Sequence, residues 1–531
     1  MRLREPAMLI SGIELRRSSR QLFRRSFTLT ATILAFAIYP ITASASEKEF
    51  TTVHKWVGTW STAPQLVETN NNPPAPGLSN NTLRQIVHVS IGGDTLRIRF
   101  SNEFSTQPVT MNSVHIAVSK GGGVIDTTTD THIYFGGKSS VTMSTDSAVW
   151  SDPFAFALGP LTDLAITIYF GSTSPDVTGH PGSRTTSYLL TGDQVARTDF
   201  SGAITTEHWY VINTVDVMAA DSTYAVAILG NSITDGRGSG TNKQDRWPDE
   251  LSRRLQANTA TRGVAVLNEG IGGNCVLGEC LGPSALSRFN RDVLQQDGVK
   301  WLIILEGIND IGGSYGGAAS ATVAKNLVAA YQQMIDLAHA RGILVYGGTL
   351  TPFAGSFYDS KDHQSAWQTV NDWIRHSGRF DEVIDFDEAL CDPKDTLRLL
   401  PTCDSGDHLH PSEAGHHAMA EAVGLSLFSA GSQVDINEKS GDQPASSSLL
   451  QNYPNPFNPS TTITFTLIRK AFVTLKVFDS LYQTVATIVF REMLPGLYSR
   501  QWEAGGLPSG VHFACLRAGS YLTTMKLVLL K

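Results

Sequence analysis

The sequence has no excess of basic residues. Its 41 Lys and Arg residues stand against 49 Asp and Glu residues, which gives a formal net charge of −8 at pH 7. Proteins that bind nucleic acid usually show a basic balance or a basic patch. The composition therefore gives no support for a nucleic acid or an anionic membrane surface as a partner.

Long hydrophobic runs are also lacking. The run near the N-terminus, residues 27–42, is broken by threonines and a proline, whereas a stable membrane span needs about 20 apolar residues. Two arginines precede this run and Ala43-Ser44-Ala45 follows it. That order predicts a secretory signal peptide over residues 1–45, cleaved after Ala45, and leaves the twin-arginine route open. We therefore expect an exported protein without a transmembrane anchor.

Cysteine is sparse, with five residues in the chain, and no Cys/His spacing matches a structural zinc site. In an exported protein, neighbouring cysteines favour disulfides. Proximity suggests one bridge between Cys275 and Cys280 and another between Cys391 and Cys403, with buried free thiols as the alternative. Cys515 has no partner in this scheme.

The chain is long enough for several domains, since 531 residues exceed the usual length of about 100–200 residues per domain. Residues 46–220 alternate apolar and polar side chains in short runs, which predicts a β-sandwich of jelly-roll type. Within this region, Ile91-Gly92-Gly93-Asp94 separates two such runs and predicts a hairpin. After a polar linker, residues 433–448, the alternation returns in residues 449–531 and predicts a small C-terminal β-sandwich.

Residues 221–432 follow a different pattern. Continuous apolar runs alternate with stretches of helical periodicity, and these runs lie at residues 224–230, 264–270, 300–307 and 341–348. Continuous apolar runs are typical of parallel strands that are covered on both faces. The pattern predicts a three-layer α/β/α domain whose functional site lies in the loops after the strands.

Polar residues occupy those loops. Ser232 follows the first run, Gly273 lies in the segment after the second, and Asn309 follows the third. Asp407 and His410 stand three residues apart, just ahead of a helix expected to begin near Pro411. The doubly wound rule brings such loops to one crevice.

This set of residue types is suited to acyl transfer. A serine becomes a nucleophile when a histidine takes its proton and a carboxylate orients the histidine. We assign these catalytic roles to Ser232, His410 and Asp407. The N–H groups of Ser232 and Gly273 and the amide of Asn309 are the kinds of donor that stabilise an oxyanion.

Four segments, GNSITDG, NEGIGGN, GIND and DHLH, occur in this order within residues 226–417. The arrangement resembles the SGNH (GDSL-like) hydrolases, some of which carry a β-sandwich ahead of the hydrolase domain, as WVGTW at residues 56–60 also suggests. The resemblance implies a domain without metal or cofactor that cleaves acyl esters through an acyl-serine. The family usually has Asp before the serine, whereas this chain has Asn231, which we expect to shape the loop.

The C-terminal region resembles the sorting domain of the type IX secretion system. NYPNPFNPSTTI, LPSGVHF and the closing MKLVLLK carry this resemblance. It implies the type IX machinery as a partner and export to the cell surface or the medium. Cys515 stands where the pattern more often has an aromatic residue.

Several residues have a second interpretation. Ser232 could be a helix N-cap, Asn309 could satisfy its own turn, and Asp310 is better suited to a helix cap than to acid catalysis. A metal cluster is a weaker possibility, with His416 and His417 expected on a helix surface; its members would be Asp404, His408, His410, His416 and His417. Core packing is favoured over a sugar platform for Trp56, Trp60 and Trp209.

Three functions compete. The leading one is an exported serine esterase that acts on short acyl esters, with polysaccharide-linked esters among the candidate substrates. The second is a non-catalytic surface carbohydrate-binding protein that retains the hydrolase shell, for which Asn231 is the only sign. An α/β-hydrolase lipase is disfavoured, because its nucleophile elbow requires a glycine two residues after the serine, where this chain has Thr234.

Overall fold

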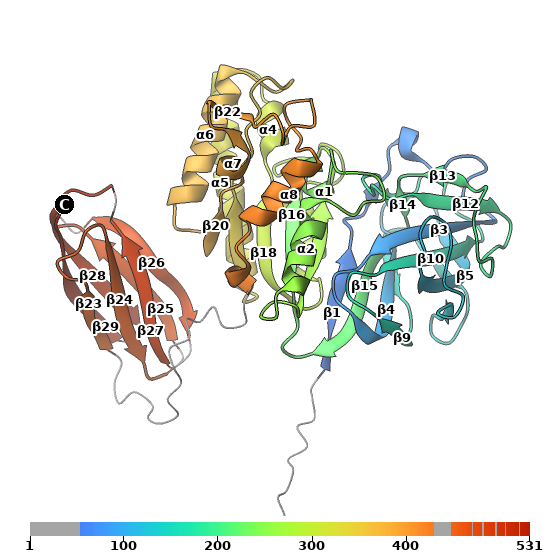
Figure 1. Ribbon diagram of the computed structural model, residues 1–531, viewed down its shortest axis with the longest axis horizontal. Helices are drawn as coiled ribbons and strands as arrows, with labels where there is room; N and C mark the ends of the chain where they lie inside the picture. The colour runs from blue at the N-terminus through green and yellow to red at the C-terminus, as the bar shows by residue number, and fades with distance from the viewer. Residues whose placement is uncertain are drawn as a thin grey trace, which may run out of the picture. The chain divides into compact units, whose positions relative to one another are not determined.

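The computed structural model describes residues 54–428 and 448–531, except positions 470, 481, 482, 494, 495, 505 and 520. The predicted signal peptide and all but the last residue of the predicted linker lie outside the described residues. Each described region is built around its own sheets, which Figure 1 labels by element.

The region from residue 54 to 220 consists of antiparallel strands in two main sheets and one small sheet. The first sheet contains β1 (His54–Ser61), β15 (Ile212–Ala220), β4 (Gly93–Asn102) and β8 (Ser147–Trp150), with β9 (Phe154–Leu158) beside β4. The second contains β13 (Ile204–Thr206), β12 (Ser187–Thr191), β3 (Asn81–His88), β10 (Asp163–Phe170), β5 (Val109–Val118) and β6 (Thr131–Ile133), with β7 (Val141–Met143) beside β5. The small sheet contains β14 (Trp209–Tyr210), β11 (Thr178–His180) and β2 (Gln65–Leu66).

The core of this region follows from the alternation in its sequence. Leu96, Ile98 and Phe100 of β4 are fully buried, as the period of two predicts. A short 3₁₀ helix, η1 (Thr69–Asn71), lies between β2 and β3.

The predicted hairpin at Ile91-Gly92-Gly93-Asp94 is wrong, because the flanking strands belong to different sheets. β3 pairs with β10 and β12, whereas β4 pairs with β15. The backbone of the connection bonds elsewhere: Val89 N donates to Thr162 O and Ser90 N donates to Thr59 O. Here the glycine pair marks a crossing between sheets, which local sequence does not distinguish from a tight turn.

The middle region contains the predicted parallel sheet. Its strand order is β17 (Val264–Gly270), β16 (Tyr224–Gly230), β18 (Val299–Leu305), β19 (Leu344–Gly348) and β20 (Glu382–Ile384), and all four neighbouring pairs are parallel. The first four of these strands coincide with the apolar runs of the sequence. β20 has only three residues and no comparable run.

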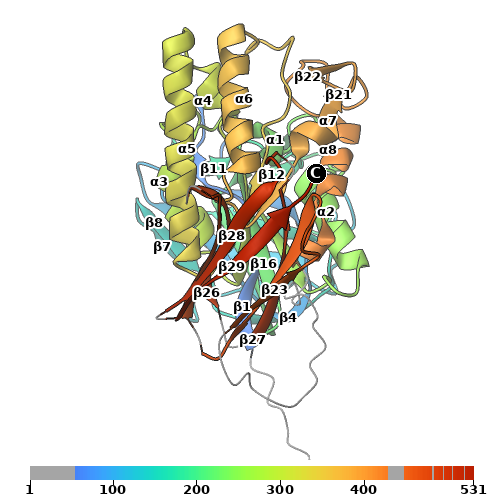
Figure 2. The same cartoon turned by 90° about the vertical axis from the view of Figure 1, so that its left-hand side faces the viewer.

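Helices cover both faces of this sheet (Figure 2). The long helices are α2 (Trp247–Ala257), α5 (Gly317–His339), α6 (Lys361–His376) and α8 (Glu413–Ala422). α5 packs beside α6, and α2 packs beside α8. No helix among the described residues is long and apolar enough to cross a membrane.

Short elements fill the loops of this region. They are α1 (Ser232–Asp235), α3 (Ala285–Phe289), the π-helical turn η2 (Asn290–Leu294), α4 (Ile308–Gly312), α7 (Phe386–Leu390), the ribbon β21 (Cys391–Asp392) with β22 (Asp395–Leu399), and η3 (Leu425–Phe428). α1 and α4 begin directly after β16 and β18, so the sheet sets their positions.

The β-sandwich and the parallel-sheet domain share buried contacts. Ala225, Ala265 and Leu267 of the parallel sheet belong to the same apolar cluster as the sandwich core. Arg97 of β4 contacts Asp297, with 2.5 Å between nitrogen and oxygen. These contacts join the two regions into one packed body.

Residues 448–531 form two further antiparallel sheets. One contains β23 (Ser448–Tyr453), β24 (Ser460–Leu467) and β27 (Gly496–Glu503); the other contains β26 (Thr484–Met493), β25 (Ala471–Phe478), β28 (Gly510–Ala518) and β29 (Tyr521–Leu529). Alternate residues of β24 and β25 are buried, including Phe465 and Leu475.

Candidate active site

Ser232 lies at the sharp turn that follows β16. Strand β16 ends at Gly230, and Asn231 takes the N-cap position, where its Oδ1 accepts a hydrogen bond from Ile233 N at 3.0 Å. Ser232 is therefore the first residue of α1 and not its cap. Asn and Asp are comparable N-cap residues, so Asn231 can shape this turn as an aspartate would.

Ser232, His410 and Asp407 form a continuous hydrogen-bonded chain. Ser232 Oγ lies 2.8 Å from His410 Nε2, and His410 Nδ1 lies 2.7 Å from Asp407 Oδ2. The other carboxylate oxygen, Oδ1, accepts from His410 N at 2.9 Å and from Leu409 N at 3.1 Å. The three-residue spacing lets one carboxylate hold both the backbone and the ring of His410.

The pKa values of Asp407 and His410 suit His410 to the role of general base. Burial raises the pKa of Asp407, but hydrogen bonds from the backbone and ring of His410 outweigh it and lower that pKa to about 2. Burial lowers the pKa of His410 below its usual value of 6.5, although Asp407 opposes this shift. At neutral pH the carboxylate is charged and the imidazole is neutral, the state that accepts a proton.

The loops that carry Gly273 and Asn309 are bonded to the nucleophile strand and to each other. Ile271 N donates to Gly230 O at 3.0 Å, and Asn309 Nδ2 donates to Asn274 O at 2.7 Å. The structure thus brings the predicted oxyanion-hole loops together with the end of β16.

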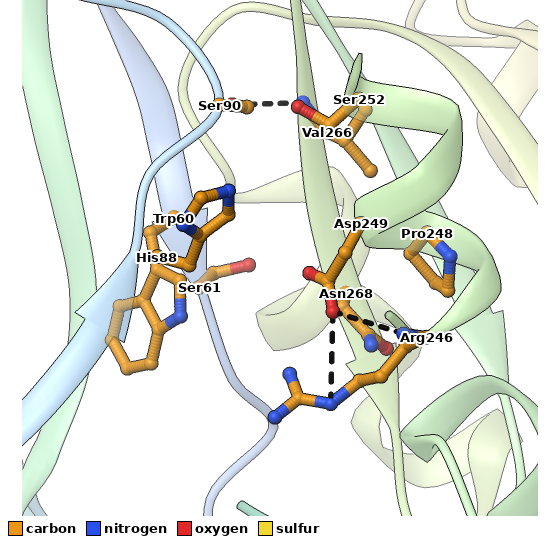
Figure 3. Close-up of a pocket in the computed structure, with 10 residues that line it drawn as sticks. All are labelled: Trp60, Ser61, His88, Ser90, Arg246, Pro248, Asp249, Ser252, Val266 and Asn268. Carbon is orange, nitrogen blue, oxygen red and sulfur yellow. Dashed lines mark hydrogen bonds and ion pairs between the residues drawn. The ribbon is translucent and has the colours of Figure 1, made fainter. Parts of the chain in front are cut away.

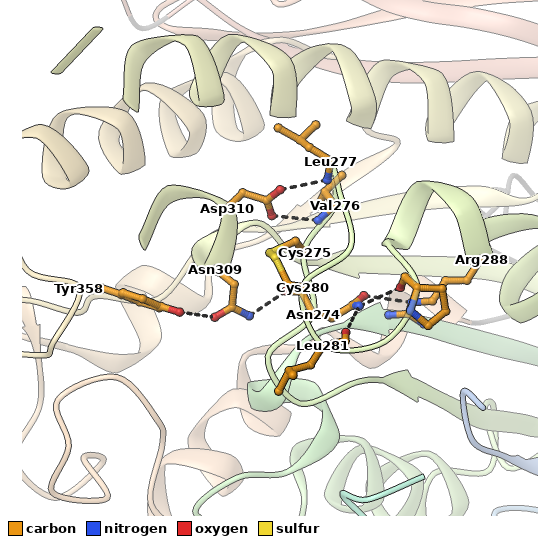
Figure 4. Close-up of a disulfide and its surroundings, with 11 residues drawn as sticks. Asn274, Cys275, Val276, Leu277, Cys280, Leu281, Arg288, Asn309, Asp310 and Tyr358 are labelled. Atoms are coloured by element: carbon orange, nitrogen blue, oxygen red, sulfur yellow. Dashed lines mark hydrogen bonds between the residues drawn. A yellow bond between two sulfur atoms is a disulfide. The ribbon is translucent and has the colours of Figure 1, made fainter. Parts of the chain in front are cut away.

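Two contacts fix the orientation of the Asn309 amide (Figure 4). Tyr358 Oη donates to Asn309 Oδ1 at 3.1 Å, while one Nδ2 proton is used by Asn274 O. An amide nitrogen has two protons, so the second remains for a substrate oxygen. This arrangement favours the oxyanion role of Asn309 over a role in its own turn.

Gly273 needs the conformation that glycine provides. Its φ is +71°, and a Cβ at this position would lie 2.7 Å from Leu281 Cδ1. A side chain here would strain the backbone, and the exposed Leu281 side chain would have to shift. The N–H of Gly273 is therefore presented by a backbone that only glycine adopts readily.

A buried arginine, Arg288, links the end of β16 to the end of β17 and to the loop that carries Gly273. Arg288 Nε donates to Asn274 Oδ1 at 3.0 Å, and its terminal nitrogens donate to Glu269 O at 2.7 Å and Gly230 O at 3.1 Å. It also pairs with Asp292 at 3.1 Å. Sequence analysis missed Arg288, Asn274 and Tyr358, because an arginine in a helix and a tyrosine in a loop give no local signal of this role.

The predicted disulfide between Cys275 and Cys280 is present beside the oxyanion loops (Figure 4). The Asp310 carboxylate accepts hydrogen bonds from Val276 N and Leu277 N, both at 2.9 Å. Asp310 therefore holds the disulfide loop, rather than capping the helix that contains it.

The predicted bridge between Cys391 and Cys403 is wrong, since both are free thiols. Cys391 lies across from Leu399 in the β21–β22 ribbon, whereas Cys403 follows the ribbon in a turn closed by a bond from its N to Leu400 O. Nearness in the sequence did not indicate that the two thiols stay unbridged.

The remaining histidines of the DHLH region have other partners. His416, expected on a helix surface, is fully buried, and its Nε2 lies 3.1 Å from Arg237 O. His408 Nδ1 pairs with Asp404 at 2.5 Å, and His417 is exposed. Within residues 54–428 and the described part of 448–531, no three His, Cys, Asp or Glu residues are grouped to hold a metal.

Of the three tryptophans predicted to pack in the sandwich core, Trp60 and Trp209 do so and Trp56 does not. Trp60 and Trp209 are buried and meet edge to face, with ring centroids 5.0 Å apart. Trp56 is partly exposed, and the Arg97 guanidinium lies over its ring at 4.5 Å.

A small cavity lies between the sandwich and the parallel-sheet domain (Figure 3). The residues that line it are Trp60, Ser61, His88, Ser90, Arg246, Pro248, Asp249, Ser252, Val266 and Asn268. At its edge, Val266 N donates to Ser90 Oγ at 3.1 Å. This cavity is separate from the candidate catalytic residues, because its lining does not include Ser232, Asp407 or His410.

Comparison with known proteins identifies the family of this part of the chain. Residues 228–418 match the GDSL-like lipase/acylhydrolase family, so the chain contains a GDSL-like acylhydrolase domain. No curated protein matches the chain in sequence.

Solved structures also resemble this part of the chain. One is a lipolytic protein of the G-D-S-L family from Desulfitobacterium hafniense, with 21% identity, a TM-score of 0.29, and coverage of 38% of this chain and 97% of that one. Another is an acetylxylan esterase from Geobacillus stearothermophilus, with 22% identity, a TM-score of 0.30, and coverage of 38% and 91%. A GDSL-like lipase from Bacteroides thetaiotaomicron has 20% identity, a TM-score of 0.27, and coverage of 37% and 84%.

Proposed function

We propose that this protein is an exported serine esterase that hydrolyses short-chain carboxylic esters. The observation that carries the proposal is the hydrogen-bonded chain from Ser232 Oγ through His410 to Asp407, with distances of 2.8 and 2.7 Å. A serine hydroxyl bonded to an imidazole, whose other nitrogen bonds a carboxylate, supports the roles of nucleophile, base and orienting group.

In the first half-reaction, Ser232 Oγ attacks the ester carbonyl carbon and His410 Nε2 takes the hydroxyl proton. The carbonyl oxygen becomes an oxyanion, held by the N–H groups of Ser232 and Gly273 and by Asn309 Nδ2. When the tetrahedral intermediate collapses, His410 gives its proton to the leaving alcohol oxygen. The product is an acyl-serine, and Asp407 stabilises the transient imidazolium throughout.

The second half-reaction repeats these steps with water. His410 takes a proton from water, whose oxygen attacks the acyl carbon. Collapse of the second intermediate releases the carboxylic acid, and the proton returns to Ser232 Oγ. The residues described here carry out both halves without a cofactor.

Hydrolysis of p-nitrophenyl acetate tests the proposal. The wild type should turn over, and Ser232→Ala should lose about 10⁶-fold in kcat, by analogy with other triad deletions. A wild-type protein that folds but does not hydrolyse the ester would favour the non-catalytic binding function instead.

For substrate range, we propose short acyl groups, including acetyl esters on polysaccharide. The chain's predicted export and its multidomain build support this proposal. Rates on p-nitrophenyl esters of increasing length, followed by acetylated xylan and pectin, test it. A rising rate with chain length would contradict the short-acyl assignment.

For location, we propose export through the signal peptide and release or surface attachment through the C-terminal β-sandwich. The motifs NYPNPFNPSTTI, LPSGVHF and MKLVLLK support a type IX sorting role. Deletion of residues 449–531 should trap the protein in the periplasm of a type IX-competent host, as measured by cell fractionation. Unchanged arrival in the medium would contradict this role.

A further inference from the structure

Two arginines lie on the histidine side of the site and have no place in the mechanism above. Arg237 follows α1, and its backbone N–H donates to Ser232 O at 2.8 Å. Its carbonyl lies 3.1 Å from His416 Nε2, so the backbone of Arg237 is anchored at two points. The side chain is 59% exposed, with Nε 3.9 Å from Asp407 Oδ2. The guanidinium is therefore beside the triad and open to solvent.

The second arginine, Arg184, comes from the β-sandwich. Its backbone is left-handed, with φ of +51°, and its carbonyl accepts from Asn242 N at 2.9 Å. The flanking residues are also tied to the segment after the nucleophile: Thr186 N donates to Asn242 Oδ1 at 2.7 Å, and the Arg246 guanidinium donates to Ser183 O. Within the part of the chain that the structure describes, the buried Nε of Arg184 has no hydrogen-bond partner.

Geometry places both arginines near the nucleophile turn. Arg237 lies 3.9 Å from Asp407 Oδ2, and Arg184 belongs to a segment, residues 183–186, that is hydrogen-bonded to Asn242 and Arg246 of the stretch after Ser232. Burial lowers the pKa of His410 most, and Arg237 and Arg184 lower it further, while Asp407 opposes them. His410 must take up a proton during the reaction, and positive charges beside it disfavour its protonated form. A negative charge on the substrate would offset this repulsion.

The mechanism determines which part of the substrate meets these arginines. His410 Nε2 delivers its proton to the oxygen of the leaving alcohol, so the alcohol portion must lie next to His410. Arginine recognises carboxylate and phosphate groups through charge-assisted hydrogen bonds. On the basis of the proposed esterase function, we propose that Arg184 and Arg237 bind an anionic group, carboxylate or phosphate, on the alcohol portion of the substrate.

Matched substrates test this proposal. We would measure kcat/KM for an O-acetylated methyl galactopyranosiduronate and for its uncharged uronamide, which differ only in the charge of one group. O-acetyl glycerol phosphate and O-acetyl glycerol form a second pair that tests phosphate in the same way. The wild type should prefer the anionic member of at least one pair by about tenfold or more, as expected when a charge-assisted hydrogen bond is gained.

Variants then assign the preference to the two arginines. In Arg184→Gln and Arg237→Gln the ratio of anionic to neutral kcat/KM should fall several-fold, and in the double variant it should approach one. Arg379→Gln is the matched control, because Arg379 pairs with Asp336 on α5 and should leave the ratio unchanged. Added salt should weaken the wild-type preference.

The outcomes separate this inference from the function on which it rests. If the wild type hydrolyses the neutral and anionic members of both pairs equally, the anion site is overturned and the esterase remains. A preference that persists in the double variant also overturns it. If the wild type hydrolyses no ester, including p-nitrophenyl acetate, the proposed function itself fails.

A separate observation concerns His180, which reaches from the β-sandwich to the nucleophile helix. His180 Nε2 lies 2.8 Å from Asp235 Oδ1, and its Nδ1 lies 3.0 Å from Ala63 O. The side chains of His180 and Asp235 are 4% and 3% exposed. Asp235 is the last residue of α1, whose first residue is Ser232. We infer that His180 is a positioning residue, which holds the serine turn through Asp235.

His180→Ala tests this second inference against Arg97→Gln, which breaks another contact between the two regions but does not touch α1. His180→Ala should lower kcat and the rate at which a fluorophosphonate labels Ser232 by up to about 10²-fold, with KM little changed. A displaced catalytic group can cause a loss of this size. Arg97→Gln should lower only the melting temperature.

Equal kcat losses in the two variants, or a His180→Ala effect confined to KM, would overturn the positioning role. If His180→Ala does not fold, Asp235→Asn provides the test, because it keeps the shape of the side chain. This variant should lower kcat several-fold, and an unchanged kcat would overturn the inference.

Discussion

The histidine side and the oxyanion side of this site are built differently. His410 itself is buried, but Asp407 beside it is about one-third exposed and Arg237 is mostly exposed, so charged and solvent-exposed groups flank the base. On the oxyanion side, Asn309, Asn274 and Arg288 are buried, and a disulfide closes the adjacent loop. The comparison suggests that proton transfer is adjusted by charge, whereas the oxyanion donors are fixed by packing and hydrogen bonds.

The largest loss of kcat is expected when the Asp407 carboxylate loses its charge. Asp407→Asn keeps the shape of the side chain but removes the charge that orients His410 and stabilises its imidazolium. We expect kcat to fall by about 10⁴-fold, as when other triads lose this charge. Steady-state kinetics on p-nitrophenyl acetate measures the loss. A decrease below tenfold would show that Asp407 does not serve the base.

The oxyanion side should be less sensitive to a single change. Asn309→Ala removes one of three donors, so we expect kcat to fall by about 10²–10³-fold with KM little altered. Burst kinetics should show that acylation is slowed. A normal acylation rate would remove Asn309 from the oxyanion hole.

A smaller effect is expected from the residue that orients Asn309. Tyr358→Phe removes the hydrogen bond to Asn309 Oδ1, and a neutral hydrogen bond contributes about 1 kcal/mol, which corresponds to roughly fivefold in kcat. Tyr346→Phe is the matched control, since its hydroxyl bonds Leu427 O at 2.7 Å away from the oxyanion loops. Equal losses in both variants would mean that Tyr358 only stabilises the fold.

The sequence predicted which motif residues meet in this site better than it predicted the residues that support them. Ser232, Gly273 and Asn309 lie in short motifs after apolar runs, so strand order brings them together. Asp407 and His410 share one short motif just ahead of a helix. Arg288, Tyr358 and His180 act through contacts with residues distant in the sequence, and such contacts leave no local pattern.

The errors have the same origin. The glycine pair at Gly92 and Gly93 resembled a hairpin turn, and Cys391 and Cys403 looked close enough to bridge. Both interpretations used sequence distance where the packing of whole sheets and ribbons decides. His416 was misplaced because its burial depends on contacts with the loop at Arg237.

The pH dependence offers a finer test of the histidine side. Burial lowers the pKa of His410, and only the neutral ring accepts a proton. The rate should therefore rise with pH through a midpoint below 6.5 and then level off, while Asp407, with a pKa of about 2, stays ionised throughout. In Arg237→Gln the midpoint should move upward, because a cation that disfavours the imidazolium is removed. A kcat/KM profile for a neutral ester checks both points, and a rate that does not fall at any acidic pH at which the protein stays folded would contradict the role of His410.

Covalent labelling by a fluorophosphonate tests most directly whether residues 232, 407 and 410 form a working nucleophile. Peptide mass spectrometry should find one adduct per chain, on Ser232, with labelling much slower in Asp407→Asn and abolished in Ser232→Ala. Stoichiometric labelling at another residue, or labelling that is unchanged in Ser232→Ala, would contradict the account.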